Sequence, residues 1–355
     1  MTTTALSFDQ IQQLVYTLES ENQTDARETL QNYFNECEAL AGDDSEQLLF
    51  SLFLNALNKR YFQTAMNENI YQKQYEVSQI QLFDILIHRF PFVRISQEIC
   101  NKTMVQYMMY HTEITLIDIG MGLGTQMIHV LRMAASIPGL KKINLIGIEP
   151  FEEALLKAGK AIQEIKVELP FEVQFFPVQA YAEETDFTAL PGIQGPVLVN
   201  ASLALHHIQS KTKREQTLRN IRQLNPLAVL ITEPNVNHFE SNIQERIQHS
   251  YHHFYNLFCV IDQLDIEEAE KGALKLFFGR EIEDILGKKE SDRFEKHEPG
   301  THWIQYLKHC QFQLNADRLQ IPDQYESFLH IEKQDSGLLG FRYQNETILS
   351  LICAN

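Results

Sequence analysis

Apolar residues recur at helical spacing from residue 7 to residue 110, and no run in this stretch alternates as a half-buried strand does. Ser7 precedes the first apolar run and suits a helix N-cap. Pro91 breaks the chain before a further helix. Beyond the first helix, we predict helices at 47–57, 79–87 and about 94–110. The pattern therefore predicts an all-helical N-terminal lobe over residues 1–110.

From residue 113 the pattern changes to short apolar runs that alternate with longer amphipathic runs. Alternating strands and helices predict a parallel sheet with helices on both faces, an α/β core that we place at 111–355. Seven strands are predicted, at about 114–119, 143–148, 172–178, 196–200, 227–232, 312–319 and 347–353. The helices predicted between these strands lie at about 125–136, 151–167, 211–223 and 299–310.

The connection after the predicted strand at 227–232 is too long for a single crossover helix. It holds a long run rich in aromatic and histidine residues, 239–258, and a second helical run, 267–286. We predict that a helical insertion at about 238–290 packs against the N-terminal lobe and completes an α-helical cap.

The composition is that of an ordinary soluble globular protein, with 355 residues of which 44% are hydrophobic and 22% are charged. The net charge of −17 repels phosphate backbones, so we expect no direct nucleic-acid binding. The best basic run, Lys211–Arg214, is short and is typical of a solvated helix face. No run of about 18 apolar residues exists, so we expect no membrane span.

The cysteines and the N-terminus bear on the compartment. The five cysteines include no Cys-x-x-Cys spacing, and an odd number fits reduced thiols better than a disulfide framework. The N-terminus has no basic segment followed by an apolar one, so we expect no conventional signal peptide. We therefore expect a cytoplasmic location and leave export by an unconventional route open.

The segment 114–125 is typical of a buried strand that ends in Asp118 and continues into a turn with three alternate glycines, Gly120, Gly122 and Gly124. Glycines let the backbone turn sharply and let a ligand lie against it. The spacing Asp-x-Gly-x-Gly-x-Gly is typical of S-adenosylmethionine-dependent methyltransferases. A nicotinamide-binding turn would need a glycine where Thr125 stands, and Asp118 would repel a pyrophosphate but suits an ammonium group. We favour methyl-donor binding over dinucleotide binding and over a turn without a ligand.

Candidate ligand contacts also follow the second and third predicted strands. Glu149 ends the second strand, where a carboxylate can accept both ribose hydroxyls, and Pro150 after it is a further candidate cofactor contact. An acid before Pro150 also suits a helix cap. After the third strand, Tyr181 stands where many methyltransferases hold adenine with an acid. The backbone of Tyr181 and Ala182 could still meet the adenine, or the segment is a simple loop.

The fourth predicted strand ends in Asn200, which with Ala201 would face the methionine part of the donor. The Leu-His-His-Ile sequence that follows is familiar from small-molecule methyltransferases, and His206 or His207 could border the substrate. Adjacent histidines on a helix cannot both point into one pocket, so at least one of them is structural or solvated.

Several motifs resemble the GRAS domain family over residues from about 48 to the C-terminus. The matches are 91–101 to PFxxxxxxxAN, 199–206 to VNxxxxLH, 232–238 to VExExNH, 279–282 to GREI, 293–298 to RxExHE, and 339–341 to LGW. Trp303 falls at the tryptophan of the family, whereas Asn235 replaces an acid, Phe341 replaces a tryptophan and the terminal SAW is not preserved.

This resemblance implies a Rossmann-like methyltransferase fold, here with a mostly parallel seven-stranded sheet and an α-helical cap. The family is best known for plant transcriptional regulators, which have mostly lost the glycine-rich motif and act by protein–protein contacts. The intact glycine turn of this chain favours a member that still binds S-adenosyl-L-methionine or S-adenosyl-L-homocysteine. The charged motif residues are expected to form a structural polar network: Arg280, Glu281, Glu295, His297 and Glu298.

Methyl transfer to an oxygen or nitrogen needs a general base near neutral pH, and histidine or a glutamate suits that role. The candidate catalytic residues are Glu233, His238 and His206. The candidate substrate contacts are Asn101, Asn237, His252 and Tyr255. An apolar wall is predicted from Tyr251, Phe254, Tyr255 and Phe258, although an aromatic stripe at helical spacing is more often core. His249, His252 and His253 lie at helical spacing, but no cysteine or acid nearby completes a metal-binding set, so we predict no metal site.

Two functions therefore stay open. The first is a methyltransferase that acts on a small hydroxyl- or carboxyl-bearing molecule. The second is a non-catalytic, ligand-binding regulatory module that binds a protein partner or a second copy of itself through the cap.

Overall fold

The computed structural model describes residues 5–20, 23–40, 44–63, 79–334 and 337–355. The chain forms two compact units. The helical unit comprises Met1–Phe90, Val236–His297 and Tyr343–Ile348, and the sheet unit comprises Pro91–Asn235, Glu298–Arg342 and Leu349–Asn355. Helix α5 (Pro91–Met108) thus belongs to the sheet unit, whereas we placed it in the N-terminal lobe. The reason is packing, because α5 contacts helix α6, and Cys100 Sγ lies 3.5 Å from Thr232 Oγ1 on a sheet strand.

The sheet unit is built on eight strands in the order β3-β2-β1-β4-β5-β8-β7-β6. The strands are β1 (Glu113–Ile119), β2 (Lys142–Ile148), β3 (Glu172–Val178), β4 (Val197–Ser202), β5 (Ala228–Pro234), β6 (Leu329–Lys333), β7 (Leu339–Tyr343) and β8 (Glu346–Ala354). The first five strands of that order pair in parallel, and β8 pairs antiparallel with β5. The strand order reverses between β1 and β4, and ligands of open parallel sheets bind at such a point.

The five parallel strands and β8 confirm six of the predicted strands, but the predicted total of seven is wrong. The predicted strand at 312–319 holds only an isolated bridge from Leu314 to Ala354 and a short 3-10 turn, Ala316–Arg318. Strands β6 and β7 were not predicted from the sequence. In β6 only Leu329 and Ile331 are buried, so this strand lacks the continuous apolar run that marks the parallel strands.

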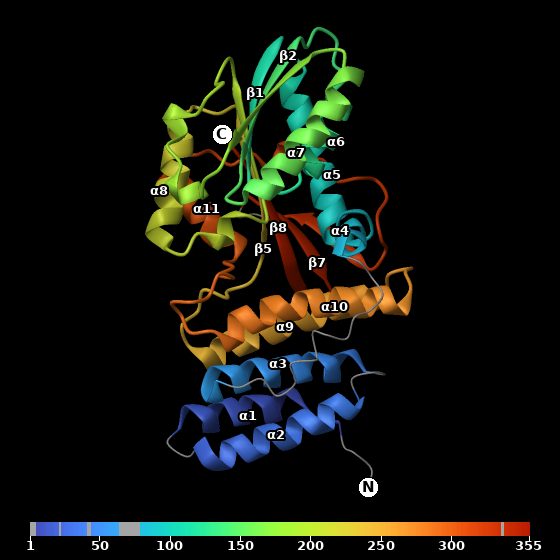
Figure 1. Ribbon diagram of the computed structural model, residues 1–355, viewed down its shortest axis with the longest axis vertical. Coiled ribbons are helices and arrows are strands. Elements are labelled where there is room, and N and C mark those ends of the chain that lie inside the picture. Colours follow the sequence, from blue (N-terminus) through green and yellow to red (C-terminus); the bar gives the residue numbers. More distant parts are fainter. Residues whose placement is uncertain (1–4, 21–22, 41–43, 64–78, 335–336) are drawn as a thin grey trace. The chain divides into compact units, whose positions relative to one another are not determined.

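Helices cover both faces of the sheet (Figure 1). Helices α5, α6 (Thr125–Ala134) and α7 (Glu152–Ile165) lie on one face, and α8 (Lys211–Gln223) and α11 (Gly300–His309) lie on the other. On the second face Leu218, Trp303 and Leu307 pack into a buried cluster with β-strand residues such as Val199 and Ile231. The sheet unit is therefore a mixed α/β structure with two helical layers.

The helical unit contains α1 (Phe8–Glu19), α2 (Gln23–Leu40), α3 (Ser45–Phe62), α4 (Gln79–His88), α9 (Ile243–Asp262) and α10 (Glu268–Ile282). A π-helix, Glu283–Gly287, extends α10. Helix α3 contacts α2 as well as α9, α10 and the π-helix, which explains why it is buried on nearly all sides. Glycine at 287 lets the π-helix approach α3 closely, because a Cβ there would lie 3.1 Å from the carbonyl oxygen of Ala56 and would push the two segments slightly apart.

The aromatic residues of α9 form part of the core of the helical unit. The Tyr251 ring stacks on Phe8 with centroids 3.9 Å apart, and its hydroxyl donates to Glu46 at 2.6 Å. Phe254 and Phe258 are buried. The predicted apolar substrate wall is therefore packed protein interior at these three positions, as an aromatic stripe at helical spacing usually is.

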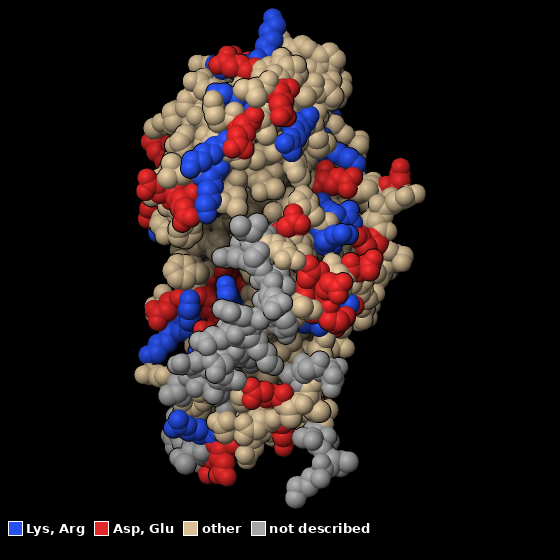
Figure 2. Space-filling model, turned by 45° about the vertical axis from the view of Figure 1, so that its right-hand side comes forward, with Lys and Arg blue, Asp and Glu red and all other residues tan. Residues whose placement is uncertain are grey.

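The charge on the surface and the character of the helices can be compared with the predictions about nucleic acid and membranes. On the face shown in Figure 2, the described lysines and arginines lie among aspartates and glutamates, and no extended basic surface is visible there. Among the described helices, none combines the length and the apolar character needed to cross a membrane.

Candidate functional site

The glycine turn after β1 has the left-handed backbone that its sequence predicts. Gly120, Gly122 and Gly124 have φ values of +74°, +52° and +76°. A Cβ at Gly120 would lie 2.5 Å from the Cβ of Ala204, so only glycine lets the loop after β4 approach. A Cβ at Gly122 would meet no atom within 4 Å, so open space lies above that residue. The turn thus joins a closely packed side to an open one.

Glu149, at the end of β2, braces this turn. Its side chain is 7% exposed. One carboxylate oxygen accepts the Gly122 N–H at 3.0 Å, and the other accepts the Phe151 N–H at 3.2 Å, just before α7. Each oxygen keeps a further lone pair that can accept from a ligand hydroxyl. The capping role and the ligand-binding role predicted for Glu149 are therefore compatible.

A chain of buried polar side chains connects the acid of β1 to α5. The Asn200 Nδ2 group donates to Asp118 at 2.8 Å and to Gln126 Oε1 at 3.2 Å, and Gln126 Nε2 donates to Asn101 Oδ1 at 3.1 Å. Asp118 and Asn200 are direct partners in the β1–β4 register, which brings them together. The Oδ1 atom of Asn200 is buried and accepts no hydrogen bond from the described residues.

Asp118 has a strongly perturbed acidity. Burial, followed by the nearby charge of Glu149, raises the pKa of Asp118 to about 7, although the hydrogen bond from Asn200 opposes the shift. Its carboxyl group is thus divided between neutral and charged forms near neutral pH. A carboxyl group poised in this way responds strongly to a cationic ligand.

The remaining predicted cofactor contacts lie at or beyond the carboxyl ends of neighbouring strands. Pro150 follows β2 and is half-buried, whereas the Tyr181 side chain is 49% exposed. Ala182 begins a 3-10 turn, Ala182–Glu184, beyond β3. Ala201 is buried in β4 opposite Ile119. Because β1 to β4 are parallel, these residues lie along one edge of the sheet.

His206 and Glu233 form a buried pair after β4 and within β5. His206 Nδ1 lies 2.5 Å from Glu233 Oε2, and both side chains are buried. The other oxygen of Glu233 accepts the N–H groups of Ala204 at 3.1 Å and Leu205 at 2.7 Å. Glu233 therefore fixes both the imidazole ring and the loop that carries it. The neighbouring His207 is exposed, so only one of the adjacent histidines is buried.

The third predicted catalytic residue, His238, belongs to the helical unit. It is fully buried, and its Nδ1 lies 2.8 Å from Nδ1 of His297. Burial lowers the pKa of His238 well below its ordinary value, with further lowering by His297 and His253. Burial likewise lowers the pKa of His253 to about 3. These histidines are uncharged core residues, so within its own unit the surroundings of His238 are structural.

The predicted substrate residues are divided between the units. Asn101 belongs to the buried polar chain of the sheet unit described above. In the helical unit, the Asn237 carbonyl oxygen lies 3.0 Å from His249 Nδ1, and the His252 side chain is exposed. The Tyr255 ring is half-buried, with its centroid 5.5 Å from that of Tyr251. Within the described part of the sheet unit, the structure pairs the predicted catalytic residues His206 and Glu233.

One buried ion pair contradicts the sequence-based interpretation of residues 211–214. Arg214 is fully buried instead of solvated, and it donates to Glu298 at 2.6 Å and to two backbone carbonyls, those of Ile208 and His206. The Glu298 carboxylate also accepts from Tyr306 at 2.9 Å. Burial lowers the pKa of Arg214. The charge of Glu298 opposes this effect, but the pKa is lowered overall. The expected structural role of Glu298 fits these contacts.

Gln126 is a further residue that the sequence did not single out. It links Asn200 to Asn101 and lies two residues after Gly124. The sequence feature that could have indicated this role is a glutamine among apolar residues at the start of a helix.

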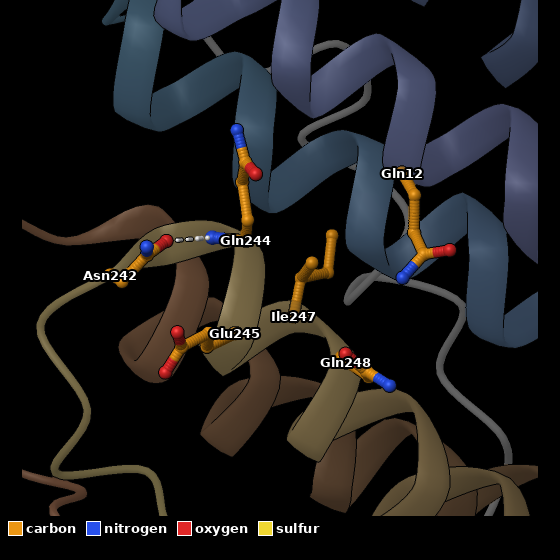
Figure 3. A pocket seen from close by; sticks show the side chains of 6 residues that line it. All are labelled: Gln12, Asn242, Gln244, Glu245, Ile247 and Gln248. Carbon is orange, nitrogen blue, oxygen red and sulfur yellow. Dashed lines mark hydrogen bonds between the residues drawn. The ribbon is translucent and has the colours of Figure 1, made fainter.

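A separate hollow of about 210 Å³ lies in the helical unit. It is lined by Gln12 of α1 and by residues at the start of α9: Asn242, Gln244, Glu245, Ile247 and Gln248 (Figure 3). The Asn242 side chain caps α9 by accepting the Gln244 N–H at 2.9 Å. The lining is mostly amide, so it offers no nucleophile paired with a base.

Comparisons with known proteins place these features in context. The GRAS domain family model matches residues 8–349. The DELLA protein GAI of Gossypium hirsutum is 23% identical over 264 residues, which cover 71% of this chain and 48% of that protein. The GRAS family protein TF80 of Medicago truncatula is 24% identical over 292 residues, covering 64% of this chain and 67% of that protein.

A solved structure agrees with the fold. The crystal structure of SCL7 from Oryza sativa matches with a TM-score of 0.73 at 18% identity, over 90% of this chain and 94% of that one. The likeness to SCL7 therefore extends across nearly the whole fold. By contrast, the chain spans somewhat less than half the length of the DELLA proteins that it matches.

Proposed function

The chain belongs to the GRAS domain family, and from that premise we propose that it is a regulatory, protein-interacting member that binds S-adenosylmethionine or S-adenosylhomocysteine at its glycine turn. The observation that carries the ligand proposal is the open space above Gly122, whose N–H donates to the buried carboxylate of Glu149 in the turn that follows the buried Asp118. The resemblance to the GRAS family, whose best-known members act by protein contacts, supports the regulatory use of the ligand.

The residues at the turn fit the chemistry of such a ligand. Asp118 offers a carboxyl group to an α-ammonium, and Glu149 has lone pairs for ribose hydroxyls. The buried Asn200 Oδ1 offers an acceptor. The exposed Tyr181 ring and the backbone of Ala182 would meet the adenine. In this proposal the ligand joins the ends of β1 and β2, which stabilises the liganded form by mass action.

Ligand affinity is expected to fall as pH drops below about 7. Neutral Asp118 cannot hold an ammonium by charge, so affinity for S-adenosylhomocysteine should weaken by roughly tenfold per pH unit below the pKa of about 7. Asp118→Asn should bind weakly at pH 8 and lose this pH dependence. Calorimetric titrations between pH 5.5 and pH 8.5 measure both effects. The same slope in wild type and Asp118→Asn would remove Asp118 from the site.

In the unliganded protein, the effect of Asp118 on stability has the opposite pH dependence to its effect on ligand affinity. The pKa of Asp118 is raised in the fold from 3.8 to about 7, so its contribution to stability is present below pH 3.8 and is lost as pH rises through 7. Asp118→Asn should therefore be more stable relative to wild type at pH 8 than at pH 5. Urea unfolding at the two pH values separates this effect from ligand binding.

Methyl transfer is a second candidate function, and the His206–Glu233 pair favours it. S-adenosylmethionine, when bound, supplies a methyl group activated as a sulfonium. In the tautomer with a proton on Nδ1, His206 donates to Glu233, and an imidazole oriented in this way could take a proton from an acceptor hydroxyl.

A Glu233→Gln variant distinguishes the two uses of the ligand. Catalysis predicts formation of S-adenosylhomocysteine with some member of a panel of small hydroxyl- and carboxyl-bearing acceptors, and a loss of about 10² to 10⁴-fold in the variant. The variant should still bind S-adenosylhomocysteine, because glutamine keeps an oxygen for the Ala204 and Leu205 N–H groups. Binding without turnover by wild type on the whole panel would instead favour the regulatory proposal.

A further inference from the structure

Two buried arginines of the helical unit share a single carboxylate. Arg246 of α9 and Arg293 have side chains with no exposed surface, whereas the side chain of Glu290 is 46% exposed. One oxygen of Glu290 accepts from Arg246 Nη1 at 2.5 Å, and the other accepts from Arg293 Nη2 at 2.6 Å. Glu290 thus bridges the two guanidinium groups from an exposed turn.

This carboxylate leaves part of both guanidinium groups without a partner. The Nε and Nη2 atoms of Arg246 and the Nε atom of Arg293 are buried and donate to no acceptor among the described residues. In the described part of the chain, each arginine has one further acceptor, namely the Glu240 carbonyl for Arg246 at 2.7 Å and the His238 carbonyl for Arg293 at 2.8 Å. Buried donors without acceptors are costly, so this arrangement favours an additional oxyanion.

The local charge is also unbalanced. Burial, followed by the positive charge of Arg293, lowers the pKa of Arg246 to about 10, and Arg60 contributes in the same direction. Burial alone would raise the pKa of Glu290, but the hydrogen bonds and charges of the two arginines lower it overall. Lys288, on the same turn, is already paired with Asp284. Two guanidinium charges therefore face one carboxylate in a chain whose net charge is −17.

We propose that Arg246 and Arg293 form a binding site for a phosphate group, for which the carboxylate of Glu290 is an internal competitor. A phosphate monoester carries nearly two negative charges and three acceptor oxygens, which match two guanidinium groups better than one carboxylate does. Arginine suits this task, because its planar fork donates to two phosphate oxygens at once.

The exposed turn that carries Glu290 can move away from the two arginines with little loss of packing. Residues 289–292 are exposed, and within the turn the Asp292 N–H donates to the Lys289 carbonyl at 2.9 Å. Arg60 holds its base by donating to the Lys288 carbonyl at 2.7 Å. The unpartnered arginine nitrogens are buried, so a phosphate would reach them only when Glu290 moves aside. Affinity should therefore depend on the charge of Glu290.

Titration of the full chain with inorganic phosphate and with a phosphoserine peptide, followed by ³¹P NMR, tests this site. Glu290→Gln should bind both probes roughly tenfold more tightly than wild type. The control, Glu245→Gln, removes an equal charge from an exposed position next to Arg246 and should bind as wild type does. Arg293→Lys should abolish binding, because lysine lacks the fork.

The two probes distinguish a phosphorylated protein from a free anion as the natural ligand. Tighter binding of the phosphoserine peptide than of free phosphate assigns the site to a phosphorylated protein, and the reverse order assigns it to a free anion; both support the site. Glu290→Gln lies on an exposed turn and should remain folded by circular dichroism, so it tests the proposal even where an arginine variant unfolds. No binding of either probe by folded Glu290→Gln would overturn the proposal and leave the arginines a purely structural role.

Discussion

Gly122→Arg is expected to abolish binding of S-adenosylhomocysteine while the chain stays folded. A side chain at this position meets no protein atom within 4 Å of its Cβ, so it would project into the open space proposed for the ligand. The backbone at φ +52° adds strain of about 1–2 kcal/mol for a non-glycine residue. We expect affinity to fall by at least about a hundredfold, measured by calorimetry at pH 8.

Gly139→Arg provides a matched control for that variant. Gly139 also has a positive φ, +87°, and a Cβ there also meets nothing within 4 Å, but it lies before β2 at the opposite end of the strands. It should suffer similar strain and keep full affinity. Equal affinities of Gly122→Arg and wild type would show that the ligand does not occupy the space above Gly122.

Arg214→Met is expected to destabilise the protein by about 3–5 kcal/mol, because it leaves the Glu298 carboxylate buried without its guanidinium partner. Both side chains have no exposed surface, so solvent does not screen the loss. Two backbone carbonyls, of Ile208 and His206, also lose their donors. Urea unfolding followed by the fluorescence of Trp303, which lies under Arg214, measures the change.

Two comparisons isolate the buried pair as the cause. Arg219→Met on the same helix breaks an exposed ion pair with Glu215 and should alter stability by less than about 1 kcal/mol. The double variant Arg214→Met with Glu298→Leu should recover part of the lost stability, because no charge stays buried alone. A loss below about 1 kcal/mol in Arg214→Met itself would contradict the structural role of this pair.

The parallel part of the sheet could be predicted from the sequence because its strands are short apolar runs with polar ends. The run from Ile114 to Asp118 is one example, and the turn that follows it was predicted from glycine spacing alone. The observed strand register then placed Asn200 beside Asp118. Strand β6 could not be predicted in this way, because its two buried side chains alternate with polar ones in a run of five residues.

Long-range partners explain what the sequence could not supply. Arg214 sits in a basic run typical of a helix surface, and its burial is explained by its partners in the fold, above all Glu298, 84 residues away. Gln126 likewise acquires its role from Asn101 and Asn200. His238 looked catalytic by motif, but within the helical unit it is enclosed by His253, Phe254 and His297. Residue type and spacing do not reveal such surroundings.

A crystal structure of the full chain grown with S-adenosylhomocysteine tests the proposed ligand site most directly. We predict that the amino-acid part of the ligand contacts Asp118, that the ribose contacts Glu149, and that the backbone of Gly122 lies against it. Ligand density at any other place, or protein side chains filling the space above Gly122, would contradict the proposed function.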